Sequence, residues 1–490
     1  MTLLKDILPS KVIETVGNLD TEITGISFDS RKVKKGDLFV ALSGNNIDGC
    51  TFIFDAIQHG AVATLIEGNR KNVEIPVVKV QNAREALSEV SAKFYKNPSE
   101  KIKLIGITGT KGKTTISYMV QSILRKAYGK AFRMGTIDYD MEYDVIPAKN
   151  TTPESQIVQS LMAEALKNGV KHGVMEVSSH SLKLWRVENV NFSVAGFTNL
   201  SLEHTEFHHD MDDYFNAKKR LFLDLPFKNK KNVINIDNEY GQKLLKECNK
   251  AGLNVSTVSI KNNEADVFAV NPVIKGTESS FVLHCNGKEK ECKINLGGEY
   301  NLFNALMAAG MCSALGAEID DICEGLANLK SVPGRLESVE NNKGINVIVD
   351  YAHSPDALKN VLSALRPVTE KKLICVFGCG GNRSHEKRPV MGKTAIELSD
   401  VVVVTSDNPR KEDPQKIVDE IMDGINSTTI PENKRVYQIV DRKEAIFKAL
   451  SLAEQGDTVL IAGKGHETGQ YFADKTIAFD DREVAKSFFK

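Results

Sequence analysis

The chain has 490 residues, and its 63 Lys and Arg residues against 64 Asp and Glu give a formal net charge of −1. This balance lacks the basic excess typical of nucleic-acid-binding proteins, no apolar run approaches the roughly 20 residues that cross a bilayer, and the N-terminus lacks the apolar segment of a secretory signal. Eight cysteines without a CxxC pair favour free thiols in a reducing compartment over a disulfide framework or zinc site, so we expect a cytoplasmic protein without nucleic-acid or membrane partners.

The length exceeds what one hydrophobic core supports, and we expect an α/β protein of three domains. In the first, residues 1–98, apolar runs predict strands at 23–27, 38–41, 62–66 and 77–80, and a helix at 83–95 ends before Asn97-Pro98. Between the first two strands, Asp29, Ser30 and Arg31 place an acceptor, a hydroxyl and a cation within one turn. On their own these residues indicate a charged surface turn.

The second predicted domain, residues 99–332, opens with the sequence GITGTKGKTT at 106–115. An apolar strand is expected at 102–107 and a helix at 116–128, the arrangement that cradles phosphate groups with backbone N–H donors. Lys113 supplies a cation for the terminal phosphates and Thr114 a hydroxyl for Mg²⁺. The spacing departs from the usual pattern, because Ile107 stands where a glycine is expected, five positions before Gly112. The loop predicts a nucleotide site in a mostly parallel sheet; the alternative is an ordinary glycine turn.

Polar clusters follow three further apolar runs of this domain, at 173–177, 194–198 and 233–236. In parallel α/β sheets, ligands bind beyond the carboxyl ends of the strands. Glu176 lies inside the first run, where an ionised carboxylate is costly unless it is paired or metal-bound, so it is either a Mg²⁺ ligand or part of a buried ion pair. His204 follows the second run, but Mg²⁺ prefers oxygen ligands. Lys218 lies on a predicted helix at 214–225 whose adjacent basic residues indicate a solvated face.

The third predicted domain, residues 333–490, begins at the Pro-Gly turn of VPGRLE. Apolar runs at 347–349, 373–377, 401–404 and 458–461 alternate with helical segments, which predicts a parallel, Rossmann-like sheet. The loops after these runs would meet at one sheet edge, and their cations and carboxylates suit a zwitterionic substrate. They contain Arg383, Asp407, Arg410, Lys464, His466 and Glu467. No GxGxxG sequence opens the domain, so a dinucleotide is not indicated.

A nucleotide site in one domain and a zwitterion site in another leave three functions open. An amide ligase would use ATP to activate a carboxylate as an acyl phosphate, which an amine then attacks. A small-molecule kinase would form a phosphorylated product without an amine, and a nucleotide-switch protein would form no covalent product. Release of ADP and phosphate only in the presence of both a carboxylate and an amine would single out the ligase.

The motifs, taken in order, resemble those of the Mur ligase family over nearly the whole chain. The matching stretches are DSR with GDLFVA, GITGTKGKTT, NTTP, MEVSSHSL, FTNLSLEH, YFNAKKRLF, GEYNLFNAL, PGRLE, DYAHSPDAL, FGCGGNR, DNPR and GKGHE. The resemblance implies an ATP-dependent ligase of peptidoglycan precursor synthesis, with an N-terminal UDP-binding domain, a central P-loop ATPase domain and a C-terminal domain that binds the amino acid. We also expect a monomer.

The resemblance further implies which residues form each site. The residues implied for the UDP-sugar substrate are Phe28, Ser30, Asn45, Asn46, Ile47, Asn150, Thr151, Thr152, Ser178 and Arg186. Those implied for ATP are Gly109, Thr110, Lys111, Gly112, Lys113, Thr114, Thr115, Asn301, Arg335 and Asp350. Those implied for Mg²⁺ are Thr114, Glu176, His204 and Lys218, and the catalytic set is Lys113, Glu176, His204 and Lys218. Lys218 matches a lysine that the family carries as a carbamate (N6-carboxylysine), whose anionic oxygens suit Mg²⁺ where an ammonium would repel it.

The DNPR loop resembles the form of the family that adds meso-diaminopimelate to UDP-N-acetylmuramoyl-L-alanyl-D-glutamate. Arg410 would hold the distal carboxylate, which lysine lacks. The set implied for the amino acid is Arg383, Asp407, Asn408, Pro409, Arg410, Gly463 and Glu467. The alternatives are the L-lysine-adding form, which usually lacks this Arg, and a folylpolyglutamate-type ligase, against which the N-terminal DSR unit argues. His353 and His466 are the candidates for a general base.

Overall fold

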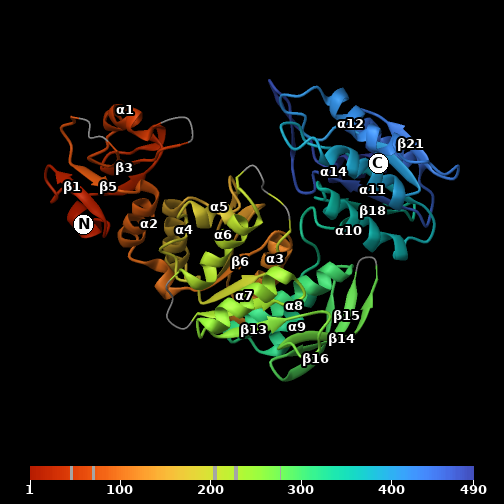
Figure 1. Ribbon diagram of the computed structural model, residues 1–490, viewed down its shortest axis with the longest axis horizontal. Coiled ribbons are helices and arrows are strands. Elements are labelled where there is room, and N and C mark those ends of the chain that lie inside the picture. Colours follow the sequence, from red (N-terminus) through yellow and green to blue (C-terminus); the bar gives the residue numbers. More distant parts are fainter. Residues whose placement is uncertain (45–47, 69–71, 202, 204–206, 226–229, 276–277) are drawn as a thin grey trace. The chain divides into compact units, whose positions relative to one another are not determined.

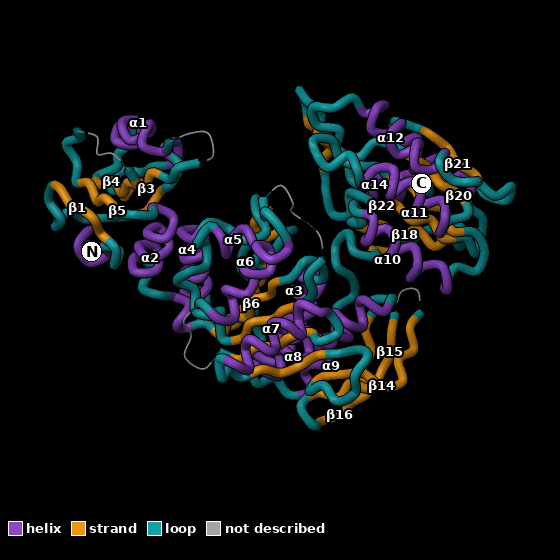
Figure 2. The backbone as a smooth tube through the Cα atoms, viewed as in Figure 1, coloured by secondary structure: helices purple, strands orange, loops and turns teal. Residues whose placement is uncertain are grey.

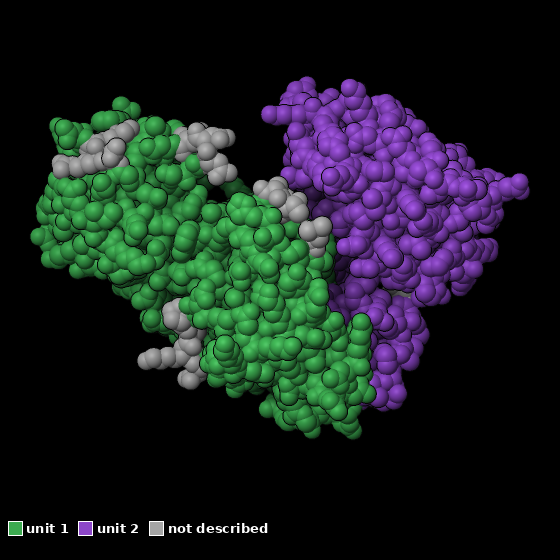
Figure 3. Space-filling view, viewed as in Figure 1, with its two compact units in different colours: residues 1–269, 283–290, 306–325 green, residues 270–282, 291–305, 326–490 purple. Residues whose placement is uncertain are grey.

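The computed structural model describes residues 1–490 except 45–47, 69–71, 202, 204–206, 226–229 and 276–277 (Figure 1). The protein is α/β with three domains, each built on its own main sheet, which confirms the predicted fold class. The chain divides into two compact units (Figure 3), and the N-terminal domain shares the first unit with most of the central domain. The first contains Met1–Ala269, Leu283–Lys290 and Leu306–Gly325, and the second contains Val270–Val282, Glu291–Ala305 and Leu326–Lys490. The domain boundaries at 98/99 and 332/333 stay a prediction.

The N-terminal domain is a five-stranded sheet of order β1-β5-β4-β3-β2, in which β1 is antiparallel to β5 and the other neighbours are parallel. Alternate residues of β3 face opposite sides: Leu38 and Val40 pack with helix α2, whereas Phe39 and Ala41 pack with α1. The elements are η1 (Leu4–Ile7), β1 (Val12–Val16), β2 (Gly25–Ser27), η2 (Ser30–Lys32), β3 (Asp37–Ala41), η3 (Gly49–Phe52), α1 (Ile53–Gln58), β4 (Ala63–Glu67), β5 (Val77–Val80), α2 (Ala83–Phe94) and η4 (Pro98–Lys101).

The central sheet has the order β16-β15-β14-β13-β12-β11-β6-β10-β7-β8-β9. The strands from β7 to β14 in this order pair in parallel, and β8 and β9 add antiparallel pairs at one end. Helices α4, α6 and α7 pack on one face, and α8 contacts the other through Gly310 and Met311. The elements are β6 (Lys103–Thr108), α3 (Lys113–Tyr128), β7 (Phe132–Met134), β8 (Asp138–Asp140), β9 (Val145–Pro147), α4 (Ser155–Lys167), β10 (His172–Glu176), α5 (Ser179–Lys183), β11 (Val194–Phe197), α6 (Met211–Leu223), β12 (Lys231–Asn235), α7 (Glu239–Lys250), β13 (Val255–Val258), β14 (Val267–Ile274), β15 (Ser279–Cys285), β16 (Lys288–Ile294), α8 (Glu299–Leu315) and α9 (Ile319–Asn328).

The C-terminal sheet has the order β17-β18-β22-β19-β20-β21, and only the β17 pair is antiparallel among its described pairs. Helices α10, α11 and α12 cover one face and α13 and α14 the other, so the sheet lies between two helical layers (Figure 2). The elements are β17 (Glu337–Val339), β18 (Asn346–Asp350), α10 (Pro355–Leu365), η5 (Arg366–Val368), β19 (Leu373–Phe377), α11 (Lys387–Leu398), β20 (Val401–Val404), α12 (Pro414–Asn426), β21 (Arg435–Gln438), α13 (Arg442–Leu452), β22 (Thr458–Ala462), β23 (Gly469–Tyr471), β24 (Thr476–Ala478) and α14 (Asp481–Phe488).

Candidate active site

The glycine loop lies between β6 and α3, as predicted. Gly109 at φ +149° and Gly112 at φ +88° adopt backbone conformations that other residues rarely adopt, and a Cβ on Gly109 would collide with the hydroxyl of Thr198. Lys113 Nζ donates to the carbonyls of Gly109 at 2.8 Å and Thr110 at 3.0 Å. The lysine of the loop therefore bridges carbonyls of its own loop.

The loop after β11, which is the parallel neighbour of β6, supports the glycine loop from the side. Asn199 Oδ1 accepts from the Lys111 N–H at 2.9 Å, and the Thr198 hydroxyl donates to the Lys111 carbonyl at 2.7 Å. The Thr110 N–H donates to the Asn199 carbonyl at 2.9 Å. In the sequence, Thr198 ends an apolar run and Asn199 begins the polar cluster after it, but neither residue was assigned a role. Their position at the carboxyl end of a neighbouring strand is the signal that points to them.

Glu176 ends β10 and is fully buried. Its Oε2 accepts from the Thr114 hydroxyl at 3.1 Å and from the Thr136 hydroxyl at 2.9 Å, and its Oε1 accepts from the Thr136 N–H at 3.0 Å. A hydroxyl and a carboxylate in contact are a donor pair that fits Mg²⁺. His204 lies outside the described residues, and among the described ones no cluster of three or more His, Cys, Asp or Glu could hold a metal ion.

Lys218 is almost fully buried on α6, so the expectation that it belongs to a solvated basic face is wrong. Its Nζ donates to the Gly109 carbonyl at 2.9 Å and lies 4.6 Å from the centre of the Tyr214 ring. Burial and the nearby Lys113 ammonium hold the pKa of Lys218 well below its usual range. Lys219 instead pairs with Glu247 at 2.9 Å, nearer the surface.

Several residues predicted for the UDP-sugar substrate cluster beside Glu176. The Thr152 hydroxyl donates to the Glu176 carbonyl at 2.7 Å and accepts from the Ser178 N–H at 3.0 Å. Arg186 donates through Nη1 to the Thr152 carbonyl at 3.1 Å and through Nη2 pairs with Glu154 at 2.7 Å. The structure thus brings together Thr152, Ser178 and Arg186.

The other residues of that predicted set are spread more widely. The Asn150 carbonyl accepts from the Tyr139 hydroxyl at 2.7 Å, close to the Thr152 cluster in the chain. Phe28 packs against the core of the N-terminal domain, and Ser30 is buried there. Asn45, Asn46 and Ile47 lie outside the described residues.

The loops after β20 and β22 meet in the C-terminal domain, as predicted. The fully buried Lys464 Nζ donates to Asn408 Oδ1 at 2.9 Å and pairs with Glu467 at 3.1 Å, while Asn408 Nδ2 donates to Glu467 at 2.7 Å. Arg410 donates to the Gly381 carbonyl at 2.8 Å. Gly463, at φ +116°, lies beside the Asp407 carboxylate. The nearby Arg383 is exposed.

Two buried arginines, Arg442 and Arg388, contact these loops from the interior of the domain. Arg442 pairs with Asp481 at 2.7 Å, both side chains are fully buried, and Arg442 also donates to the carbonyls of Ser406 at 3.3 Å and Ala462 at 2.9 Å. Arg388, fully buried on α11, pairs with Glu412 and Glu420, each at 2.9 Å. The loops after β19, β20 and β22 are therefore tied to charges in the interior.

Three residues predicted for ATP belong to the second unit, so their relation to the glycine loop stays a prediction. Asp350 accepts from the N–H groups of Leu336 at 2.9 Å and Ala352 at 2.8 Å, and burial raises its pKa. Asn301 donates to the Gly297 carbonyl at 2.8 Å. The Arg335 guanidinium lies 4.8 Å from the centre of the Tyr351 ring.

The sequence of the chain was compared with protein-family models and with known proteins. Family models match in chain order: "Mur ligase family, catalytic domain" at residues 22–95, "Mur ligase middle domain" at 107–312 and "Mur ligase, glutamate ligase domain" at 334–465. A UDP-N-acetylmuramoyl-L-alanyl-D-glutamate--2,6-diaminopimelate ligase of Clostridium tetani is 43% identical over 482 residues, 97% of this chain and 96% of the relative. The chain belongs to the Mur ligase family.

Other relatives agree with this assignment. A ligase of the same name from Alkaliphilus oremlandii is 42% identical and covers 99% of this Mur ligase and 97% of the relative. A solved structure of a ligase of that name superposes with a TM-score of 0.71 at 29% identity and covers 100% of this chain and 98% of the other. A MurF ligase from Thermotoga maritima in complex with ADP, at 20% identity and a TM-score of 0.65, shares the fold.

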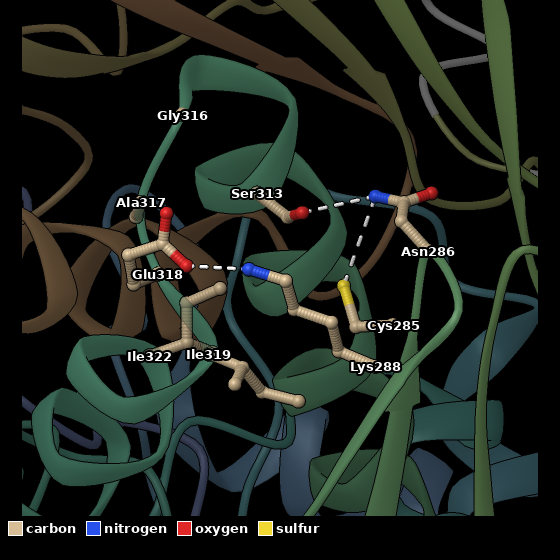
Figure 4. Close-up of a pocket in the computed structure, with 9 residues that line it drawn as sticks. All are labelled: Cys285, Asn286, Lys288, Ser313, Gly316, Ala317, Glu318, Ile319 and Ile322. Atoms are coloured by element: carbon tan, nitrogen blue, oxygen red, sulfur yellow. Dashed lines mark hydrogen bonds and ion pairs between the residues drawn. The ribbon is translucent and has the colours of Figure 1, made fainter.

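A separate pocket of about 150 Å³ opens in this Mur ligase between the β15–β16 turn and the start of α9 (Figure 4). Lys288 points toward Glu318, with which it pairs at 2.5 Å, and Asn286 donates to the Ser313 hydroxyl at 2.9 Å. None of the residues predicted for a site lines it. Among the described residues, no helix has the length and apolar character that crossing a membrane requires.

Proposed function

We propose that this Mur ligase adds meso-diaminopimelate to UDP-N-acetylmuramoyl-L-alanyl-D-glutamate, with ATP as the energy source. The observation that carries the proposal is the identity of about 40% over almost the full length to relatives named as 2,6-diaminopimelate ligases. The Arg410 loop supports the choice of amine, because a guanidinium binds a carboxylate through two hydrogen bonds. We further propose that the enzyme acts as a monomer in the cytoplasm, where peptidoglycan precursors are made.

The chemistry follows from a carboxylate, an amine and a triphosphate. The γ-carboxylate of the D-glutamyl residue attacks the γ-phosphorus of ATP, and ADP leaves. The amine of diaminopimelate attacks the resulting acyl phosphate, phosphate leaves, and the amine loses a proton as the amide forms. Lys113 stabilises charge on the phosphates, and the backbone N–H groups of the glycine loop position them. Thr114 and Glu176 would hold Mg²⁺, which neutralises charge on the phosphate oxygens.

We propose that Lys218 works as a carbamate. A lysine reacts with carbon dioxide through its neutral amine, and burial next to Lys113 lowers the pKa of Lys218 and so enriches that form. As an ammonium, Lys218 shares the Gly109 carbonyl with the Lys113 ammonium, and two like charges repel each other. As a carbamate it would instead attract Lys113 and offer oxygen to a metal ion.

The deciding experiment uses the purified enzyme with ATP, the UDP-linked dipeptide and one amino acid at a time, and mass spectrometry of the product. We expect a product with meso-diaminopimelate and little with L-lysine. In Arg410→Ala, the KM for diaminopimelate should rise about 100-fold, because one bidentate carboxylate contact is lost, while the KM for ATP stays within about twofold. Lys411→Ala removes the same charge from the next position and is the matched control. Efficient use of L-lysine by the unaltered enzyme would refute the choice of amine.

A further inference from the structure

Three hydroxyl groups and one carboxylate form a row from the glycine loop to Thr151, a residue predicted for the UDP-sugar substrate. Thr136 lies in the turn between β7 and β8, and its hydroxyl contacts both Glu176 Oε2, at 2.9 Å, and the hydroxyl of Thr151, at 3.1 Å. Gly135 makes this approach feasible, because a Cβ there would collide with the Glu176 carboxylate. Glu176 in turn accepts from Thr114 in the glycine loop. Thr136 was not among the residues singled out in the sequence.

The direction of these hydrogen bonds follows from counting hydrogens. A carboxylate only accepts, so the single hydroxyl hydrogen of Thr136 is donated to Glu176. The contact between the two threonines then requires Thr151 to donate its hydrogen to Thr136. The Thr151 oxygen is left with lone pairs and no hydrogen. Toward a bound molecule, Thr151 is therefore an acceptor that favours an N–H group and disfavours a carboxylate.

We propose that Thr136 is a positioning residue that fixes Thr151 as an acceptor for an amide N–H of the muramoyl-dipeptide substrate. This inference rests on the proposed function, because it names a contact to that substrate. The carboxylates of the dipeptide are then left to cationic groups such as Arg186, which lies with Thr152 in the same cluster. The arrangement lets the site distinguish the peptide N–H from the carboxylate that reacts.

Thr136→Val tests whether Thr136 positions Thr151, because valine keeps the side-chain shape and the backbone N–H bond to Glu176 but removes the hydroxyl. The measurement is the Kd of UDP-N-acetylmuramoyl-L-alanyl-D-glutamate by calorimetry, without ATP or Mg²⁺. We expect a Kd raised on the order of tenfold in Thr136→Val and Thr151→Val, and no further rise in the double variant. Thr136→Ser keeps the hydroxyl and should recover most of the affinity.

A matched control is available in the same unit. Thr257 contacts Asp266 through its N–H at 2.7 Å and its hydroxyl at 2.8 Å, which copies the contacts of Thr136 to Glu176 away from the site. Thr257→Val should leave the Kd unchanged. Equal Kd values for the unaltered protein, Thr136→Val and Thr151→Val would overturn the positioning role of Thr136 and leave the proposed function standing. No binding of the nucleotide to the unaltered protein would overturn both.

Substrate analogues test the acceptor role directly, even where a variant fails to fold. In two ester analogues, an oxygen replaces one or the other amide N–H of the lactyl-alanyl-glutamyl chain. The unaltered protein should bind one of them about tenfold more weakly than the natural nucleotide, and Thr151→Val should bind both alike. Undiminished binding of both analogues by the unaltered protein would overturn the proposal.

Discussion

Two sets of loops are organised in opposite ways. One is the glycine loop at 106–115, which we propose binds phosphate and call the phosphate loop; the other is the pair of loops after β20 and β22, which we propose bind the amino acid and call the amino-acid loops. Lys113 of the phosphate loop and Lys218 of α6 both donate to the Gly109 carbonyl, so these two cations contact the backbone of the loop itself. In the C-terminal domain, Lys464 instead bridges Asn408 and Glu467, which come from two different loops. The first arrangement must exchange contacts when a polyphosphate binds, whereas the second already holds the two loops together.

This difference has an energetic consequence. A backbone carbonyl is a weak partner for an ammonium, so a phosphate group can replace it at little cost. Buried ion pairs such as Arg442–Asp481 are costly to break, because one charge is then left unpaired in the interior. We therefore expect ligand-dependent rearrangement at the phosphate loop and a fixed arrangement of the amino-acid loops with or without ligand.

The largest effect is expected for Arg442→Met. The substitution leaves Asp481 buried without its partner and removes the donors to the Ser406 and Ala462 carbonyls, which should cost about 3–5 kcal/mol. Hydrogen exchange should accelerate in peptides covering 401–410 and 458–467 and stay unchanged at 106–115. The KM for diaminopimelate should rise with it.

Two variants sharpen this test. Lys486 and Glu483 form an exposed pair at 2.9 Å on α14, the helix that carries Asp481, so Lys486→Met should change stability by less than about 0.5 kcal/mol. The double variant Arg442→Met, Asp481→Leu removes both charges and should recover much of the loss. If Arg442→Met exchanges no faster than the unaltered protein, the amino-acid loops do not depend on this pair.

Much of the fold could be predicted, because buried parallel strands are uninterrupted apolar runs. The predicted runs at 373–377 and 401–404 match β19 and β20 residue for residue. Strands β15 and β16 were missed, because exposed or half-buried residues alternate with buried ones in β15 and Lys288–Ile294 carries five charged side chains. Their signal is weaker than that of a fully buried strand.

The second-largest effect is expected in the pH dependence of the free energy of unfolding, through His466 of the C-terminal domain. Burial and the nearby Arg335 lower the pKa of His466 from 6.5 to about 4. Between these two values the unfolded chain binds a proton that the folded chain does not, so the free energy of unfolding falls as the pH falls from 6.5 to 4, by roughly 2–3 kcal/mol. The contribution to the pH dependence fades within about one pH unit above 6.5.

The measurement is an NMR titration of ¹³C-labelled histidine rings, with His466→Gln to assign the signal. We expect a midpoint near pH 4 and a smaller loss of stability between pH 7 and pH 5 in His466→Gln than in the unaltered protein. A midpoint near pH 6.5 would mean that the His466 ring is solvated and that the loop after β22 does not enclose it.

The site was harder to predict than the fold, because contacts made across the sheet leave no local pattern. Glu176 was recognisable as a carboxylate within an apolar strand, and Lys113 by its glycine loop. The adjacent basic residues predicted that Lys218 is solvated, but it is buried, because the packing of α6 directs this side chain inward. Thr198 and Lys464 acquire their roles from partners far away in the chain, at Lys111 and Asn408.

The smallest effect is expected for Thr198→Val, compared with Thr405→Val at the equivalent position of the C-terminal domain. Thr198 and Thr405 each follow a buried strand, β11 and β20, and each donates its N–H to a neighbouring strand, at 3.0 and 2.9 Å. The Thr198 hydroxyl donates to Lys111 in the phosphate loop at 2.7 Å, whereas that of Thr405 donates to Val440 at 3.2 Å. Thr198→Val should therefore raise the KM for ATP about five- to tenfold, a loss of about 1 kcal/mol, and Thr405→Val should leave it unchanged. Because both side chains are fully buried, any general cost of the methyl group is common to the pair. An equal rise in both variants would show that the phosphate loop holds its shape without this hydrogen bond.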